Sequence, residues 1–259
     1  MNHWLLALII LLIASIMTMS GRGGGNFYIV AIVLAGFNIN IAATTGQFIL
    51  VLSSLFATIF FGKNKMISWK MVIFIGIMTT ASAFLGGFFS ETFNEKLLKL
   101  IFSLFVTLAA LLMLKPFKNG RKITSKCVVH ISCNNQTFEI DLLLVAPVVL
   151  VTGFISGMVG ISGGSFLVPL MVLFIRIPIH LAVGTSTTLV MLTASAGFLG
   201  HLSSGHFNME LAIPLAIGGI IGSIIGSKIT FQLKAGSLKL IFATTSIIAA
   251  IIMIFSIYF

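Results

Sequence analysis

Residues 153–169 read Gly153-Phe-Ile-Ser-Gly-Met-Val-Gly-Ile-Ser-Gly-Gly-Ser-Phe-Leu-Val-Pro169. The stretch is apolar on both sides and is interrupted in the middle by Ser162-Gly163-Gly164-Ser165. Glycine costs roughly 1 kcal/mol relative to alanine inside a helix, so two in a row predict a helix break. Inside a bilayer, a broken backbone survives only where protein or a water-filled cavity satisfies its polar groups. The break therefore predicts a functional site.

The composition predicts an all-α polytopic membrane protein. Of 259 residues, 58% are hydrophobic and 8% are charged, which excludes an ordinary soluble domain. The net charge of +10 comes from lysines and arginines in short loops between apolar runs. The positive-inside rule accounts for this pattern, so the expected partner is the lipid bilayer and not nucleic acid.

Apolar segments divide the chain into two transmembrane regions, 1–114 and 142–259, joined by a basic linker, 115–141. A small hairpin is expected within the linker, between Thr124 and Ile140, because apolar and polar residues partly alternate there. The apolar segments are 4–19, 27–37, 41–61, 70–89 and 97–114 in the first region, and 142–161, 165–175, 181–200, 210–229 and 238–258 in the second.

The two regions repeat each other. A shift of 139 residues places Gly21, Gly24 and Gly25 on Gly160, Gly163 and Gly164. With one further inserted residue, Leu98-Lys-Leu-Ile-Phe102 matches Leu238-Lys-Leu-Ile-Phe242. We therefore expect two homologous halves, each made of a glycine-broken helix pair followed by three transmembrane helices.

Charge predicts that the halves have opposite orientations. A cytoplasmic linker places Lys63, Lys65 and Lys70 inside as well, on the way back through the first half. Only an inverted second half also places residues 228–239, with their three lysines, inside. Both termini are then outside the cytoplasmic membrane. The second arms of the broken pairs are only about 16 Å long, which favours re-entrant hairpins over full crossings.

The breaks would enter from opposite faces and meet near the bilayer midplane. Each precedes the start of a short helix, where free N–H groups and the positive end of the helix dipole bind anions. The candidate substrate-binding residues are Arg22, Gly24, Gly25, Asn26, Thr45, Gln47, Ser162, Gly163, Gly164, Ser165, Thr185 and Ser186. The expected ligand is a small anion.

Several of these residues have a structural alternative. Arg22 is either the anion partner or a side chain that snorkels to the outer interface. The hydroxyls of Thr185 and Ser186 either contact substrate or cap a helix. Close helix packing is the favoured role for Gly153, Gly157 and Gly160 and for the stripe of Gly218, Gly222 and Gly226.

Membrane-embedded catalysis is not expected. Such an enzyme needs a nucleophile–base pair or metal ligands at membrane depth, and the apolar segments offer neither. Cys127 and Cys133 both lie in the linker and are expected to be reduced cytosolic thiols. We therefore predict no enzymatic activity, no catalytic residue, no cofactor and no metal.

The chain resembles the TauE/SafE sulfite exporter family, also called TSUP. Four motifs carry the resemblance: Gly157-x-x-Gly160-x-x-Gly163-Gly164-x-x-x-x-Pro169, Ile177-Pro-Ile-His180, Ala182-Val-Gly-Thr-Ser186 and Met19-Ser-Gly-Arg-Gly-Gly-Gly25. Ile67-Ser-Trp-Lys70 and the duplication fit as well. The sequence departs from the family where Ser165 replaces a third glycine and where Asn38-Ile-Asn-Ile-Ala-Ala-Thr-Thr45 replaces a segment with Pro and Thr-Ser.

The resemblance implies export or uptake of sulfite, sulfonates or related sulfur-containing anions across the cytoplasmic membrane of prokaryotes. We predict a secondary transporter that works by alternating access. An anion channel, or a non-transporting membrane partner or assembly subunit, is the alternative. Association into a homo-oligomer is compatible with either.

Overall fold

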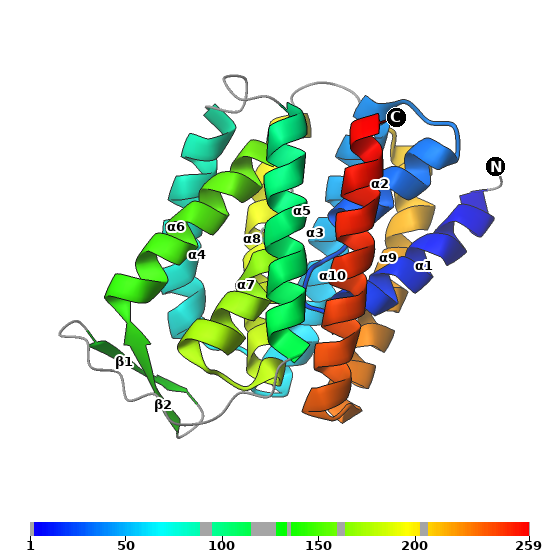
Figure 1. Ribbon diagram of the computed structural model, residues 1–259. Coiled ribbons are helices and arrows are strands. Elements are labelled where there is room, and N and C mark those ends of the chain that lie inside the picture. The colour runs from blue at the N-terminus through cyan, green and yellow to red at the C-terminus, as the bar shows by residue number, and fades with distance from the viewer. Residues whose placement is uncertain are drawn as a thin grey trace.

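The apolar segments form a bundle of helices, with one β-hairpin at its edge (Figure 1). The structure is a computed structural model that describes residues 3–88, 95–114, 128–133, 136–159, 164–202 and 207–258. The elements are α1 (His3–Met19), α2 (Gly25–Leu34), α3 (Ile39–Lys63), α4 (Trp69–Phe88), α5 (Glu95–Leu114), β1 (Val128–Cys133), β2 (Gln136–Asp141), α6 (Leu142–Val159), α7 (Gly164–Leu170), the π-helical turn η2 (Met171–Ile175), α8 (Ile179–Leu202), α9 (Met209–Gln232) and α10 (Ala235–Tyr258).

Length and hydropathy support an all-α membrane protein. Within the described residues, four helices are long and apolar enough to cross a bilayer, and further apolar helices are shorter. The four spans are Asn40–Lys63, Ile179–Leu199, Met209–Gln232 and Ala235–Ile252.

The hairpin expected in the linker is present. β1 pairs antiparallel with β2, and Cys133 stands opposite Gln136 at the turn. β2 ends at Asp141, and α6 begins at the next residue, so the hairpin leads directly into the second helical region. Residues 115–127 of the linker lie outside the described part of the chain.

The helices pack in a recurring set of pairs. α1 lies along α9 and α6 lies along α4, while α3 packs against α8 and α5 against α10. The α5–α10 pair is visible at the front of Figure 1. In the alignment of the two halves, α6 corresponds to α1 and α9 to α4, so the first two pairings are counterparts. The other two pairings each join a helix to its own counterpart.

Glycines let the α1–α9 and α4–α6 pairs approach closely, which confirms the packing role predicted for Gly153 and for the α9 stripe. A Cβ atom on Gly218, Gly222 or Gly226 would collide with a backbone carbonyl of α1. On α6, a Cβ atom on Gly153 would collide with the Ser82 hydroxyl of α4. Small residues are the usual means of close helix contact in membranes. Gly157 falls on α6, and Gly160 lies outside the described residues.

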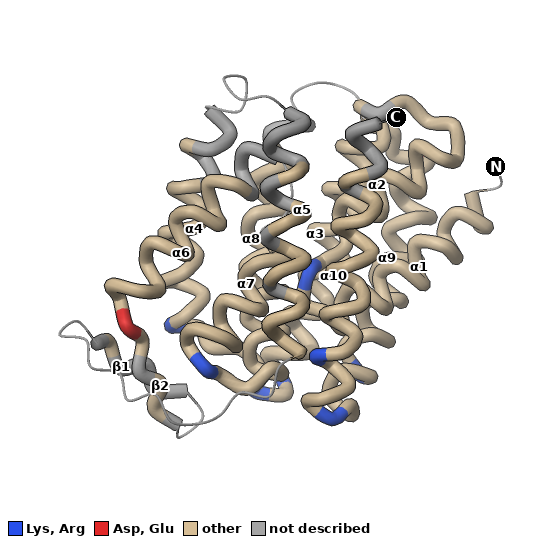
Figure 2. Tube along the Cα trace, viewed as in Figure 1, with Lys and Arg blue, Asp and Glu red and all other residues tan. Residues whose placement is uncertain are grey.

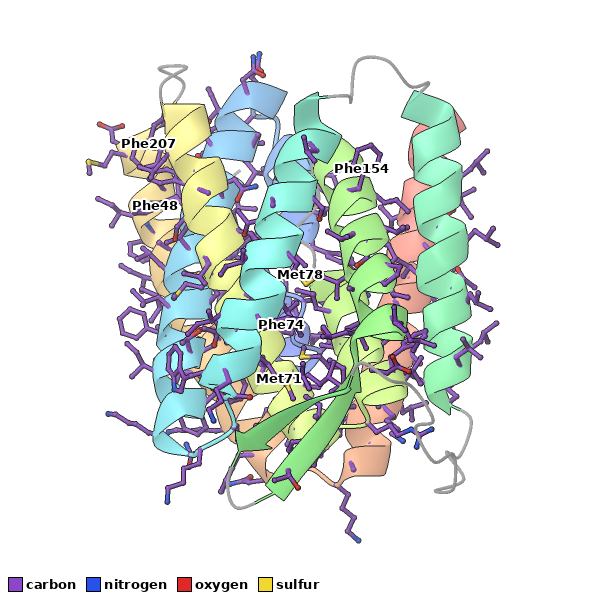
Figure 3. The ribbon with its side chains drawn as sticks, turned by 90° about the vertical axis from the view of Figure 1, so that its left-hand side faces the viewer. Phe48, Met71, Phe74, Met78, Phe154 and Phe207 are labelled. Atoms are coloured by element: carbon purple, nitrogen blue, oxygen red, sulfur yellow. The ribbon has the colours of Figure 1, made fainter. Side chains whose placement is uncertain are left out.

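Large side chains also fill the space between paired helices. Along α4, Met71, Phe74 and Met78 lie on the side toward α6 (Figure 3). Phe48 of α3 and Phe207 lie together near the end of the molecule away from the hairpin (Figure 3). Their ring centroids are 5.2 Å apart, and each ring lies within 5.5 Å of Phe198 of α8. This aromatic cluster closes the α3–α8 seam at that end.

Positive charge gathers at the hairpin end of the bundle (Figure 2). Helix ends and short connections carry these basic residues: Lys63, Lys65, Lys70, Arg176, Lys228, Lys234 and Lys239. The two chain ends lie at the opposite side of the molecule (Figure 1). Arg22 lies apart from these residues and is buried within the bundle, where its guanidinium contacts α10.

Candidate functional site

The first break is a run of left-handed glycines between α1 and α2. Gly21, Gly23 and Gly24 have φ of +69°, +73° and +78°, a region that glycine enters without the steric strain of a Cβ. Gly24 immediately precedes α2 and offers no side-chain cap to the first amides of that helix. The break therefore reverses the chain and leaves a helix N-terminus facing the interior.

Arg22 occupies this break and is 5% exposed. Its Nε and Nη2 both donate to Ser165 Oγ, at 3.0 and 2.7 Å. Its Nη1 donates to Ser246 Oγ of α10 at 3.0 Å. The guanidinium carbon lies 5.8 Å from the ring centroid of Phe242, within the range of a cation–π contact. This burial excludes the alternative that Arg22 snorkels to the membrane interface.

The first break contacts the described edge of the second break. A Cβ atom on Gly164 would lie 2.9 Å from the Arg22 Cα and 3.0 Å from the Gly21 carbonyl oxygen. From α8, Ser186 Oγ donates to the same carbonyl of Gly21 at 2.8 Å. Residues from opposite halves of the sequence thus meet in van der Waals contact. Ser162 and Gly163, the predicted centre of the second break, lie outside the described residues.

Two predicted glycines of the first break face side chains. Gly24 lies against Met17 and Tyr28, and Gly25 lies against Leu50 of α3. Asn26, the next residue, is half-buried. The close approach of these neighbours explains why small residues stand here, and in this conformation the space beside the glycines is occupied by protein.

Thr185 has a structural contact in this conformation. Its Oγ1 accepts a hydrogen bond from the backbone N–H of Ser68 at 3.0 Å, which ties α8 to the connection before α4. The neighbouring Ser186 instead holds the first break, through the Gly21 carbonyl. These adjacent hydroxyls therefore support two different segments.

Buried polar atoms without partners remain around the first break. The hydroxyl of Thr45 and the Oε1 of Gln47 make no hydrogen bond within the described part of the chain. The Tyr28 hydroxyl lies beside the Ser53 side chain. Tyr28 is 0% exposed, and the adjacent Ser53 donates its own proton to the Leu50 carbonyl at 3.2 Å. Gln47 faces Gly197 of α8, where an added Cβ would lie 3.4 Å from Oε1. Most buried polar groups in proteins are paired, so these atoms suggest a role beyond packing.

Three residues of this region were not among the sequence candidates: Tyr28, Phe242 and Ser246. Phe242 ends the Leu-Lys-Leu-Ile-Phe motif that occurs in both halves, so the repeated motif could have marked Phe242 as a candidate residue. Ser246 is one of several hydroxyl residues along α10, and nothing in its sequence position distinguishes it from the others. Tyr28 is the one phenol of the short helix α2. Their roles become visible only when α10 and α2 are placed beside Arg22 and Gly24.

The arrangement suits the binding of an oxyanion. Ser165 Oγ accepts two bonds from Arg22, so its own proton is directed away from the guanidinium. A hydroxyl that accepts from a cation is polarised and becomes a better donor to a negatively charged oxygen. The Arg22–Ser165 pair can thus present positive charge and an oriented O–H to one ligand.

Comparison with known proteins identifies the family. The family model described as "Sulfite exporter TauE/SafE" matches residues 6–253. The chain belongs to this family. This TauE/SafE protein is 28% identical over 183 residues to the probable membrane transporter protein YunE of Bacillus subtilis, covering 69% of this chain and 67% of the relative.

Two further relatives carry the same description. A probable membrane transporter protein of Methanocaldococcus jannaschii is 25% identical over 238 residues, covering 85% of this chain and 84% of the relative. One of Xylella fastidiosa is 26% identical over 167 residues, covering 64% and 60%. No solved structure matches the TauE/SafE chain. The family and these names identify it as a multi-pass membrane transporter.

Proposed function

We propose that this protein is a secondary transporter that moves a small anion, sulfite or another sulfur oxyanion or organosulfonate, across the cytoplasmic membrane. The observation that carries the proposal is the buried Arg22, held by serine hydroxyls where the two helix breaks meet. A cation at membrane depth is expensive and is by default a mark of function. The family name supports the sulfur oxyanion as substrate class.

The donors around Arg22 are suited to transient binding. The hydroxyls of Ser165 and Ser246 are neutral, and in this proposal the buried hydroxyls of Thr45 and Tyr28 join them when the site opens. Arg22 supplies the opposite charge, and the α2 N-terminus adds N–H groups. A site with one cation and neutral hydrogen-bond donors binds an anion less tightly than a site with two cations, so the anion is released faster.

Alternating access in this proposal uses two inverted halves. The pairing of α1 with α9 and of α6 with α4 supports two related units, and rocking of such units about a central site is the usual mechanism of inverted-repeat transporters. The tight contact at Gly164 and the aromatic cluster of Phe48, Phe198 and Phe207 then describe a closed conformation. Opening would separate α7 from the first break and admit the anion.

The proposed substrate is tested by counterflow. Purified protein is reconstituted into liposomes loaded with unlabelled sulfite, and entry of labelled sulfite is followed. A carrier gives transient accumulation that saturates with sulfite concentration, whereas a channel gives flux that does not saturate. Taurine-like sulfonates and sulfate are compared under the same conditions. Absence of counterflow with every sulfur anion would reject the substrate class, and non-saturating flux would reject alternating access.

The proposed topology is tested through the two cysteines. Cys127 and Cys133 are the only thiols of the chain and both belong to the linker. Because the positively charged end is expected to face the cytoplasm, a membrane-impermeant maleimide should leave intact cells unlabelled and label inverted vesicles. A cysteine placed near the N-terminus, as His3→Cys in a cysteine-free background, should show the reverse pattern. Labelling of the linker in intact cells would overturn this orientation.

A further inference from the structure

A cavity of about 310 Å³ lies between α5, α6 and the α7–η2 segment. Its floor is closed by Phe166 and Leu170, at 4% and 2% exposure. Its rim is formed by Leu108, Val151 and Phe174, which are 38–52% exposed. The cavity is therefore closed toward the protein core and open toward the outer surface of the bundle.

The cavity offers almost nothing to a polar ligand. Among the described lining residues, Thr152 is the one with a hydroxyl, and it donates that proton to the Val149 carbonyl of its own helix at 3.0 Å. An apolar cavity of about 150 Å³ is large enough for benzene, so this one has room for roughly a dozen carbon atoms. Its chemistry and size fit a segment of hydrocarbon chain.

The outer surface around the rim belongs to the bilayer. Leu104 and Leu111 continue the apolar face of α5, and Leu144 and Leu150 continue that of α6, all of them exposed. Arg176 follows η2, which packs against β2, so this exposed cation marks the membrane surface at the hairpin end. The opening thus faces the hydrocarbon region of the leaflet at that end.

We propose that this cavity is a binding site for one acyl chain of a membrane phospholipid in the leaflet at the hairpin end. The chain enters between Leu108 and Val151 and lies on the floor made by α7. α7 also carries Ser165, the hydroxyl that holds Arg22. The bound chain therefore supports from the outside the same short helix that contacts the anion site from the inside. The binding itself does not depend on the proposed transport function.

Fluorescence quenching by brominated lipid tests the proposal. In full-length protein, the two native tryptophans, Trp4 and Trp69, are replaced by Phe, and one tryptophan is introduced at a time. Phe174→Trp reports on the cavity rim. Phe231→Trp is the matched control, because Phe231 is 54% exposed and stands near the end of α9 with no part in the cavity. The probe is phospholipid brominated along its acyl chains, titrated into detergent-solubilised protein.

We expect the fluorescence quenching of the Phe174→Trp variant to saturate near one lipid per protein. Quenching of the Phe231→Trp variant should instead rise steadily with the lipid fraction of the micelle, without saturation. Adding Val151→Phe, which extends a larger side chain into the cavity, should remove the saturable phase. Leu144→Phe, on the same helix and outside the cavity, should keep it. Equal quenching in both single-tryptophan variants, or a saturable phase that survives Val151→Phe, would overturn the site.

Thermal unfolding gives a second readout that needs no tryptophan. Added phospholipid should raise the Tm of the delipidated wild-type protein and of Leu144→Phe, and raise that of Val151→Phe markedly less. Equal lipid-induced shifts in all three proteins would contradict the proposal. Neither readout involves an anion, so a negative result here leaves the sulfite proposal standing, and absence of counterflow leaves the lipid site standing.

Discussion

Replacing Arg22 with Ala should lower the transport efficiency for sulfite by about 30-fold or more, measured as initial counterflow rate over substrate concentration. Truncating a buried charge that pairs with an opposite charge costs about 2–5 kcal/mol, and each 1.4 kcal/mol is a factor of ten. In the proposed site Arg22 is the charge that compensates the anion. Without it, the anion would be transferred to a buried environment lined by hydroxyls alone, such as those of Ser165 and Ser246.

Arg22→Lys separates charge from geometry. A lysine keeps the positive charge but cannot donate to Ser165 and Ser246 at the same time through a planar fork, as Arg22 does with Nε, Nη1 and Nη2. We expect this variant to retain more flux than Arg22→Ala and less than wild type. Ser246→Ala, which removes one contact of the guanidinium and no charge, should lower the rate several-fold.

The control for Arg22 is a lysine outside the site. Lys70 is exposed at the hairpin end, and Lys70→Ala should transport at the wild-type rate. Folding of Arg22→Ala is checked by a single symmetric peak in size exclusion. The corresponding position of the second half is Ile161, so the repeat does not require a charge here. Unchanged counterflow in a well-folded Arg22→Ala would remove the arginine from the substrate site.

The sequence predicted the helical segments well because their signal is local. Apolar runs long enough to span a bilayer and glycine pairs that end helices both act over one or two turns. That the two breaks meet stays a prediction, because Ser162 and Gly163 lie outside the described residues; it rests on the repeat of Gly24 and Gly25 at Gly163 and Gly164. The contact between the first break and Gly164 agrees with it.

Side-chain partners could not be predicted in the same way. Arg22 contacts Ser246, 224 residues later in the chain, and the pairing depends on how α10 crosses the break. Thr185 and Ser186 are adjacent in sequence, yet one holds the Ser68 N–H and the other holds Gly21. Hydroxyls have no periodic signal of their own, and their partners are decided by tertiary packing.

Gly222→Ala should lower the Tm of the detergent-solubilised protein by about 2–12 °C, because overpacking a close contact costs about 1–3 kcal/mol and each kcal/mol shifts the Tm of a chain of this size by about 2–4 °C. The added Cβ would collide with the Leu11 carbonyl and lie 2.9 Å from the Ala14 Cβ. Backbone cannot rotate away as a side-chain end can, so α1 and α9 must separate. Because α1 leads into the first break, flux should fall as well.

Gly236→Ala is the matched control for this interface. Gly236 is a helical glycine near the start of α10, and an added Cβ there meets nothing within 4 Å. Alanine is the better helix former, so this variant should melt at the wild-type temperature or slightly above it. If Gly222→Ala and Gly236→Ala gave the same Tm, the carbonyl contacts along α1 would not limit stability. At position 222 the Tm should fall further with each increase in side-chain size, because each added carbon forces the α1 and α9 axes further apart. At position 236 the same substitutions should change the Tm only through their helix propensity.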